Sequence, residues 1–210
     1  MFVYRLPAAA ALSLLLLPLL LSAPPGGTDA RAGDFRRPLE VDISKFTGSW
    51  YELARTRNRL QDAKQVNGQR YSACFNVRTS FTAETSSKLR IKTFCPRRGP
   101  GGSVIRDVMN GMAVLVDGSG GRKMKVAFGS TPSRMLQRLF TGGGRDYWIY
   151  CLGPVNENGR YEWAVTGGPE RRFVFLLARE KTVSRQTRSD MLDCARREGA
   201  PVGRLMYRQR

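Results

Sequence analysis

Short segments rich in β-branched and aromatic residues follow one another from residue 49 to residue 179, and turns rich in glycine, asparagine or serine separate them. Evenly spaced strands of this kind are typical of an antiparallel sandwich or an up-and-down barrel, and eight strands close a barrel around one small ligand. Nothing in the pattern alternates strand with helix, which disfavours a parallel α/β sheet. The expected strands are residues 49–56, 69–78, 88–95, 104–116, 122–129, 146–152, 160–166 and 173–179.

Two segments outside the strand pattern have helical periodicity. An apolar stripe predicts a helix over residues 184–198, which Ser184 can cap at its start and Gly199 at its end. Residues 130–145 carry an amphipathic pattern that Pro132 opens. This second segment is interpreted as a helix packed on the barrel, a mobile lid or a membrane-contacting loop, and the sequence does not choose among them.

Residues 1–32 have the features of a secretory signal peptide and a short leader. Arg5 precedes a leucine-rich run over residues 8–21 that is short and interrupted by proline, so cleavage is favoured over an uncleaved membrane anchor. Cleavage between residues 23 and 32 would leave one domain over residues 33–210. We therefore expect a protein that is secreted or held in the lumen of the secretory pathway (extracellular or vacuolar).

Histidine is absent from the 210 residues. This removes the usual general base, the commonest metal ligand and the Ser-His-Asp triad. We predict no catalytic residue, no metal site and no cofactor. A tetrapyrrole iron would have to take tyrosine, cysteine or methionine as its axial ligand, which ranks that alternative below a lipid ligand.

The four cysteines are too widely spaced for a zinc knuckle and are expected to form disulfides. They are Cys74, Cys95, Cys151 and Cys194. Antiparallel pairing of the second and third expected strands would bring Cys74 beside Cys95, in a register that sets Val77 opposite Lys92. Cys151 would then join Cys194 on the buried stripe of the C-terminal helix. The rival pairing of 74 with 194 and 95 with 151 stays open.

The chain is strongly basic, with 35 lysine and arginine residues against 17 acidic ones and a net charge of +18. Such a charge fits an arginine-rich soluble surface, an anionic ligand, an anionic membrane or a polyanion. Nucleic acid is disfavoured, because the arginines lie in loops and lack the aromatic platform on which single strands stack.

Three sequence features, in this order, resemble the lipocalin family. They are Gly48-x-Trp50, Arg145-Asp146-Tyr147 at the start of the sixth expected strand, and Arg179 at the end of the eighth. The stretch from Trp50 to Arg55 and the tail from Met191 to Gly199 are similar to the bacterial lipocalin and apolipoprotein D-like branch, and the resemblance covers roughly residues 40–210.

The resemblance implies an all-β fold: an eight-stranded antiparallel up-and-down β-barrel with one C-terminal α-helix packed outside. It also implies a floor signature of Gly48, Trp50 and Arg179, in which the guanidinium of Arg179 packs over the Trp50 ring.

The resemblance further implies a cavity that holds a small hydrophobic ligand among inward-facing side chains. The expected cavity residues are Trp50, Glu52, Ala54, Phe75, Val114, Phe128, Trp148, Trp163, Phe175 and Leu177. Glu52 is the carboxylate among them, and we expect it to pair with an arginine rather than contact the ligand. The expected function is a carrier; the alternative on the same fold is an enzyme of the isomerase or de-epoxidase type.

Turns of an up-and-down barrel alternate between its two ends, and most of the excess basic residues fall in the turns of the open end. These are residues 55–68, 96–103, 130–146 and 167–173. The expected basic rim is Arg57, Arg59, Arg97 and Arg98. A basic rim over an apolar cup suits a fatty acid, a lysophospholipid or a similar amphipathic anion. The rim would also favour an anionic membrane surface or a polyanion.

Overall fold

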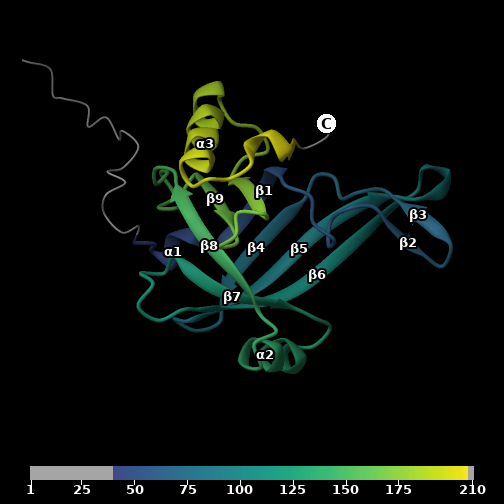
Figure 1. The fold of residues 1–210 in the computed structure, drawn as a ribbon, viewed down its shortest axis with the longest axis horizontal. Coiled ribbons are helices and arrows are strands. Elements are labelled where there is room, and N and C mark those ends of the chain that lie inside the picture. Colours follow the sequence, from purple (N-terminus) through teal and green to yellow (C-terminus); the bar gives the residue numbers. More distant parts are fainter. Residues whose placement is uncertain (1–39, 208–210) are drawn as a thin grey trace, which may run out of the picture. The chain divides into compact units, whose positions relative to one another are not determined.

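The computed structural model describes residues 40–207, so the expected signal peptide and leader lie outside the described residues. Eight antiparallel strands, each paired with its neighbours, form a barrel that closes where β10 pairs with β1 (Figure 1). They are β1 (Gly48–Arg55), β4 (Arg78–Ala83), β5 (Lys88–Arg98), β6 (Val104–Leu115), β7 (Lys123–Phe128), β8 (Arg145–Leu152), β9 (Trp163–Gly167) and β10 (Val174–Ala178). The predicted fold class is confirmed.

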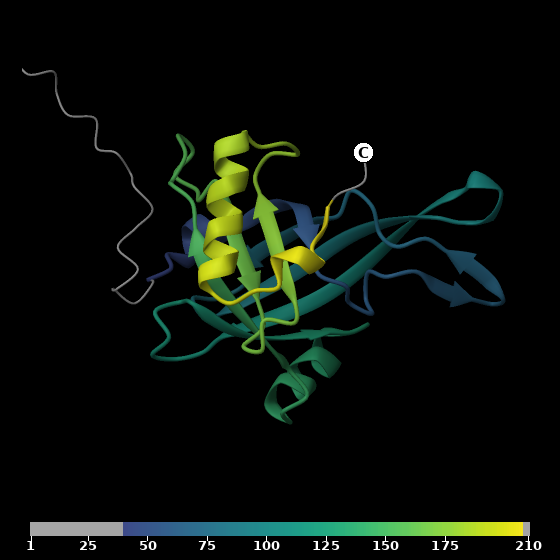
Figure 2. The same ribbon diagram turned by 45° about the horizontal axis from the view of Figure 1, so that its top comes forward.

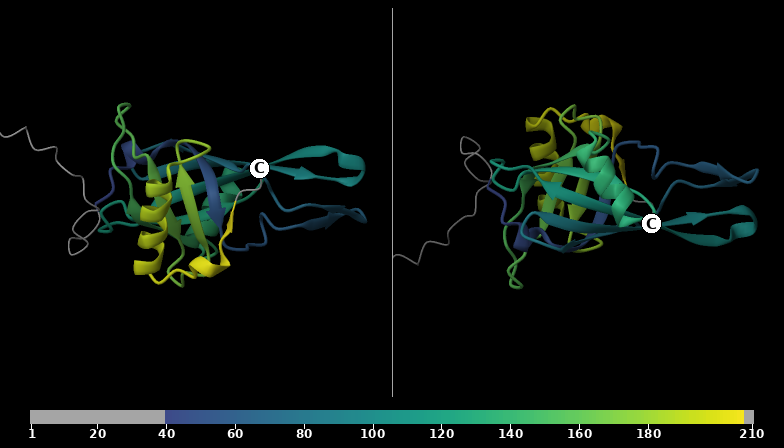
Figure 3. Two further views of the ribbon diagram at one scale, coloured as in Figure 1. Left: turned by 90° about the horizontal axis from the view of Figure 1, so that it is seen from above. Right: turned by 90° about the horizontal axis from the view of Figure 1, so that it is seen from below.

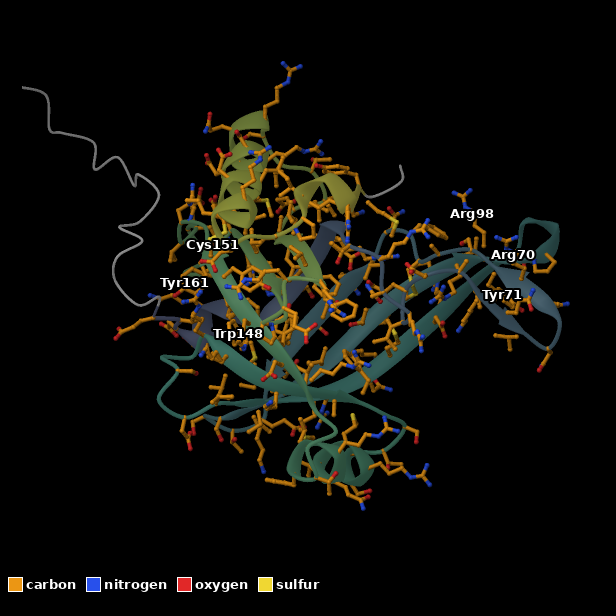
Figure 4. All side chains as sticks on the ribbon, in the orientation of Figure 1. Arg70, Tyr71, Arg98, Trp148, Cys151 and Tyr161 are labelled. Carbon is orange, nitrogen blue, oxygen red and sulfur yellow. A yellow bond between two sulfur atoms is a disulfide. The ribbon has the colours of Figure 1, made fainter. Side chains whose placement is uncertain are left out.

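The β5–β6 ladder is long, running from Lys88 opposite Val114 to Arg98 opposite Val104. Burial alternates along β5 with a period of two, so that one face of the strand enters the barrel and the other meets solvent. The far end of this hairpin projects from the barrel beside a second, short hairpin of β2 (Lys64–Val66) and β3 (Gln69–Tyr71) (Figures 1 and 2). Figure 4 marks Tyr71 on β3 and Arg98 at the end of β5 in this projection.

The predicted strand over residues 69–78 is wrong. The chain leaves strand conformation after Tyr71, and the barrel strand β4 begins only at Arg78. Asn76 has a left-handed φ of 49°, which interrupts an extended chain at that point. The register differs as well, because Lys92 lies opposite Ser80 rather than opposite Val77.

Helices occupy both segments that the sequence assigned to them. Helix α3 (Arg185–Arg197) is capped by the Ser184 side chain, and α2 (Pro132–Phe140) begins with a proline after its cap. The shorter elements are α1 (Ile43–Phe46), the 3-10 turns η1 (Pro100–Gly102) and η2 (Val202–Arg204), and β11 (Met206–Tyr207), which pairs with β1. Within residues 40–207 no helix is long and apolar enough to cross a membrane.

Apolar clusters lie on both faces of the barrel wall formed by β1, β8, β9 and β10. The inner cluster includes Trp50, Phe81 and Ile149, all buried inside the barrel. The outer cluster joins Val165 and Leu176 of the sheet to the buried stripe of α3, which lies along the outside of the barrel (Figure 3). Strands β1, β8, β9 and β10 are therefore packed on both faces, by the barrel interior and by the cluster that α3 covers.

Two disulfides reinforce this arrangement. Cys74 is joined to Cys95, with their Cα atoms 5.1 Å apart, and Cys151 of β8 is joined to Cys194 of α3 across 6.4 Å. Cys151 lies close to α3 in Figure 4. This is the pairing that the sequence favoured over its rival, although the strand register used to reach it was wrong.

Candidate functional site

The closed end of the barrel is built on Trp50 and Arg179. Trp50 is fully buried, and its indole Nε1 donates a hydrogen bond to the Phe46 carbonyl at 2.8 Å. The guanidinium carbon of Arg179 lies 3.6 Å from the centroid of the Trp50 ring, a cation–π contact. Arg179 also donates to the carbonyls of Ser49 and Lys45, each at 2.9 Å. Arg179, the residue after β10, thereby ties β1 to α1 and closes the floor.

Gly48 begins β1 where another residue would be strained. Its φ is +96°, a region that L side chains rarely adopt, and a Cβ there would lie 2.0 Å from an Arg160 guanidinium nitrogen. Burial, together with the neighbouring Arg160 charge, lowers the pKa of Arg179 to about 10. The structure thus brings Gly48, Trp50 and Arg179 together at the floor as the resemblance implies.

A cavity of about 1090 Å³ lies above this floor, inside the open end of the barrel. Its volume is at the upper end of the range for small-molecule sites. Apolar side chains from four strands contribute to its wall: Phe81, Ile91, Val126, Phe128, Phe175 and Leu177. Of the predicted cavity residues, Glu52, Phe128, Phe175 and Leu177 line the cavity. Trp50 belongs to the inner apolar cluster beneath it.

The prediction is wrong for Ala54, Trp148 and Trp163, which face the outer cluster against α3. A β-bulge between Glu52 and Ala54 shifts the alternation of β1. On β8 the inward position is Tyr147, one residue before Trp148. Because successive strand residues point to opposite faces, an error of one residue reverses the assignment.

Val114 and Phe75 also lie elsewhere. Val114 is opposite Lys125, on the outer face of the sheet, while its neighbour Ala113 joins the inner cluster. Phe75 lies in the segment that is not a strand, and the Arg98 guanidinium stacks 5.0 Å from its ring centroid. Both predictions fail because they rest on strand boundaries or phases that differ in the structure.

Arg97 is a structural clamp and not part of the rim. Its fully buried guanidinium donates to the carbonyls of Leu60 and Asp62, each at 2.6 Å, and to that of Ser72 at 2.9 Å. It also pairs with Asp107 at 3.1 Å. These bonds fix the β1–β2 loop, residues 56–63, to the β5–β6 hairpin. The alternation of buried and exposed residues along β5 continues to Arg97, whose side chain is buried. The expected strand ended at residue 95; a strand extended to residue 97 would have predicted an inward side chain there.

The mouth is lined by five arginines: Arg57, Arg59, Arg138, Arg145 and Arg172. Arg57 and Arg59 are as predicted, whereas Arg98 does not reach the cavity. The other three come from α2, β8 and the β9–β10 loop, all within the open-end segments that the sequence identified. Asp62, Asp146 and Glu170 share the mouth; Asp146 pairs with Lys125 at 2.8 Å and Glu170 with Arg172 at 3.2 Å.

Glu52 places an ionisable carboxyl in the cavity wall. Gln61 donates to its Oε2 at 2.7 Å, and Arg55 Nε lies 3.3 Å from its Oε1. The side chain keeps only 11% of its surface accessible. Burial raises the pKa of Glu52 to about 7, although the Gln61 hydrogen bond and the Arg55 charge both act to lower it. Glu52 is thus paired with an arginine, and that arginine is buried.

Other polar groups of the wall pair with one another. The Tyr147 hydroxyl lies 2.8 Å from Thr166 Oγ1, and the hydroxyls of Thr79 and Thr93 are 3.0 Å apart. Burial raises the pKa of Tyr147, and the nearby Glu52 charge adds to this rise. Tyr147 is therefore neutral at physiological pH. The polar part of the wall thus consists of neutral hydroxyl groups and one titratable carboxyl, that of Glu52.

The cavity residues are equipped to bind a ligand. All four cysteines are in disulfides, which leaves no free thiol. Across the described residues, no three acidic or cysteine side chains group closely enough to hold a metal ion. The cavity combines an apolar wall, a carboxyl whose pKa is about 7 and a mouth lined by arginines.

The chain is similar to known proteins over most of this barrel. Residues 41–210 match the family model described as a lipocalin-like domain. Temperature-induced lipocalin-1 of Arabidopsis thaliana is 24% identical over 166 residues, which cover 79% of this chain and 77% of that protein. Outer membrane lipoprotein Blc of Escherichia coli K12 is 24% identical over 170 residues, or 80% and 78% of the two chains.

Among solved structures, lobster apocrustacyanin A1 superposes with a TM-score of 0.51 at 13% identity. The match covers 79% of this chain and 77% of that one. At this identity the likeness concerns the fold, and it agrees with the closed barrel and the outer helix described above.

Proposed function

Because the chain belongs to the lipocalin family, whose members bind small hydrophobic ligands, we propose that it carries an amphipathic anion in the barrel cavity. The ligand class is a fatty acid, a lysophospholipid or a similar carboxylate or phosphate lipid. The observation that carries this proposal is the combination of an apolar inner wall with five arginines at the mouth.

The polarity of the cavity supports a tail-first orientation. Each methylene buried against the wall contributes about 0.8 kcal/mol, so the tail supplies most of the affinity. An anionic head group placed deep in the cavity would lie near the Glu52 carboxylate in a poorly hydrated site. This arrangement is unfavourable, because like charges repel strongly where water is scarce. At the mouth it meets Arg57, Arg59 and Arg145, none of which has an acidic partner within residues 40–207.

We also propose that the protein acts outside the cytosol, secreted or in the lumen of the secretory pathway, after cleavage of a signal peptide between residues 23 and 32. Two disulfides support an oxidising compartment. The proposed role is carriage without catalysis. The enzyme alternative would depend on Glu52 as the acid or base, because the cysteines are bonded to one another.

A head-group comparison tests this function. Palmitate and hexadecanol share a tail and differ in charge, and each can displace a fluorescent fatty acid from the cavity. The triple variant Arg57→Gln, Arg59→Gln, Arg145→Gln should weaken palmitate binding by roughly tenfold and leave hexadecanol unchanged. The matched control Arg70→Gln, Arg106→Gln, Arg185→Gln removes the same charge from exposed positions outside the cavity.

Equal losses for acid and alcohol would contradict the proposed role of the rim. Failure of the wild-type protein to bind either tail would contradict the carrier function itself. Native mass spectrometry of the secreted protein, with release of any bound molecule, gives an independent measurement of the ligand class.

A further inference from the structure

Three segments around the mouth each carry an arginine within two residues of an exposed large apolar residue. The pairs are Arg59 with Leu60 in the β1–β2 loop, Arg138 with Phe140 in α2, and Arg172 with Phe173 in the β9–β10 loop. The exposed fractions are 50% for Leu60, 77% for Phe140 and 39% for Phe173. Large apolar side chains at this exposure cost solvation free energy, so their recurrence around one opening calls for a partner.

These residues surround the same opening. Leu60 and Phe173 line the cavity together with the arginines beside them. Phe140 does not line it, but Arg138 before it and Gly143 after it do. The C-terminal end of α2 therefore lies at the mouth, with Phe140 on the outside of the rim.

The packing of α2 explains why Phe140 stays exposed. Met135 is buried against Met112 of β6 and Ala127 of β7, and Leu139 packs on the same cluster. The Arg138 guanidinium donates to the Phe128 carbonyl at 2.9 Å, which holds the last turn against the end of β7. The apolar face of the helix is thus already used, and Phe140 projects beyond it.

The closed end lacks this pattern. Among the described residues of its turns, 84–87, 116–122 and 153–162, Val155 is the single exposed large hydrophobic residue, at 45%. The mouth is therefore the end of the barrel that combines basic and exposed apolar residues. Val155, at the opposite end, serves as the control position in the experiments below.

We propose that the mouth docks on the surface of an anionic lipid bilayer. The rim arginines would contact acidic head groups, and Leu60, Phe140 and Phe173 would enter the boundary with the acyl chains. Charge complementarity selects this partner, because five arginines line the mouth against three acidic residues, all three of them in salt bridges. The inference builds on the proposed function: a lipid anion would pass between bilayer and cavity without crossing bulk water.

Site-specific fluorescence tests the docking face. Phe140→Trp and Val155→Trp place a new indole at the mouth and at the closed end, over the same background of three native tryptophans. We expect Phe140→Trp emission to shift to the blue and to be quenched by brominated acyl chains. The vesicles are an equal mixture of phosphatidylcholine and phosphatidylglycerol, and phosphatidylcholine alone should give neither change. Val155→Trp should respond to neither vesicle.

Vesicle co-sedimentation gives the second readout. Phe140→Ser should reduce association with the mixed vesicles by roughly tenfold, and Val155→Ser should match the wild type. The proposal is overturned by an absence of vesicle binding, by equal responses at the two positions, or by unchanged binding of Phe140→Ser, which would indicate simple adsorption of a polycation. A dimer that buries Phe140 without lipid would overturn it as well.

Vesicle-free binding of a fluorescent fatty acid separates this inference from the proposed function. Phe140 lies outside the cavity, so Phe140→Ser should retain the affinity of the wild type. Normal fatty-acid binding without vesicle docking would contradict the docking inference and leave the carrier function standing. Vesicle docking by a protein that binds no fatty acid would contradict the carrier function and leave the docking inference standing.

Discussion

The floor and the mouth of this barrel use the same residue types in opposite ways. At the floor the guanidinium of Arg179 stacks on a buried tryptophan and donates to backbone carbonyls. At the mouth, Arg57 and Arg59 are exposed and line the cavity without an acidic partner among the described residues. Aromatic residues divide similarly, with Trp50 fully buried and Phe140 largely exposed. The floor groups are satisfied within the fold, whereas Arg57, Arg59 and Phe140 at the mouth are left available to a partner.

The largest effect expected from this contrast is on folding stability at the floor. Trp50→Ala should lower the free energy of unfolding by about 4 kcal/mol, because it removes a large buried side chain and the cation–π partner of Arg179. Urea denaturation gives the measurement. Phe140→Ala at the mouth serves as the control and should change the unfolding free energy by less than about 0.5 kcal/mol. Similar losses for the two would remove the distinction.

The next effect is a pH-dependent one at Glu52. Its pKa rises from 4.5 to about 7 on folding, so the native state holds this proton more tightly than the unfolded chain does. Its contribution to stability therefore falls as pH rises from about 4.5 to about 7 and stays low above that. Glu52→Gln should raise the unfolding free energy by up to about 3 kcal/mol near pH 8 and change it little near pH 4.

Unfolding curves across this pH range check the Glu52 prediction. Glu170→Gln at the mouth is the control, because Glu170 is exposed and its removal should leave the pH dependence unchanged. Parallel pH profiles for the wild type and Glu52→Gln would show that the carboxyl is not held near neutrality.

Arg97 and Arg59 sharpen the comparison, because the sequence placed both at the rim. Arg97→Gln should cost about 2 kcal/mol in chemical denaturation, since it leaves buried carbonyls of the β1–β2 loop without a donor. Arg59→Gln should cost less than about 0.5 kcal/mol and act on ligand affinity instead. If both variants unfold like the wild type, the clamp role assigned to Arg97 is wrong.

The smallest effect is expected at Gly48. Gly48→Ala should destabilise by about 1 kcal/mol from its positive φ, with a further loss because Arg160 must move. Gly118→Ala is a matched control with φ +69° and no atom within 4 Å of its Cβ, so it isolates the backbone cost. Thermal unfolding of the two variants measures the difference, and equal shifts in Tm would mean that Arg160 adapts freely.

The barrel, its floor and the outer helix were predictable because each has a strong local signal. Strand spacing, the Gly48-x-Trp50 pair and the apolar stripe around Met191 depend on few residues and tolerate errors at element boundaries. The cavity wall was only partly predictable. A one-residue bulge reverses which side chains face inward, and the bulges after Glu52 and Ile149 have no mark in the sequence pattern.

The rim shows a different limit. Charge and position near a predicted loop assign both Arg59 and Arg97 to the basic rim. Only their tertiary contacts show that Arg59 belongs there and Arg97 does not. The carbonyls that hold Arg97 come from Leu60, Asp62 and Ser72, which lie far from it along the chain. Local pattern carries no information on such a bond, although the continued alternation of β5 does indicate an inward side chain.

The inner and outer apolar clusters, on opposite faces of β1, β8, β9 and β10, separate the ligand compartment from the contact with α3. On β10, Phe175 and Leu177 face the cavity, while Leu176 between them packs in the cluster that holds α3. Replacing the first kind reshapes the compartment and leaves the helix contact in place. Ligand specificity could therefore diverge through evolution, or be redesigned, by substituting the inward-facing residues of a strand. The alternate, outward-facing residues would keep the barrel and its helix contact intact.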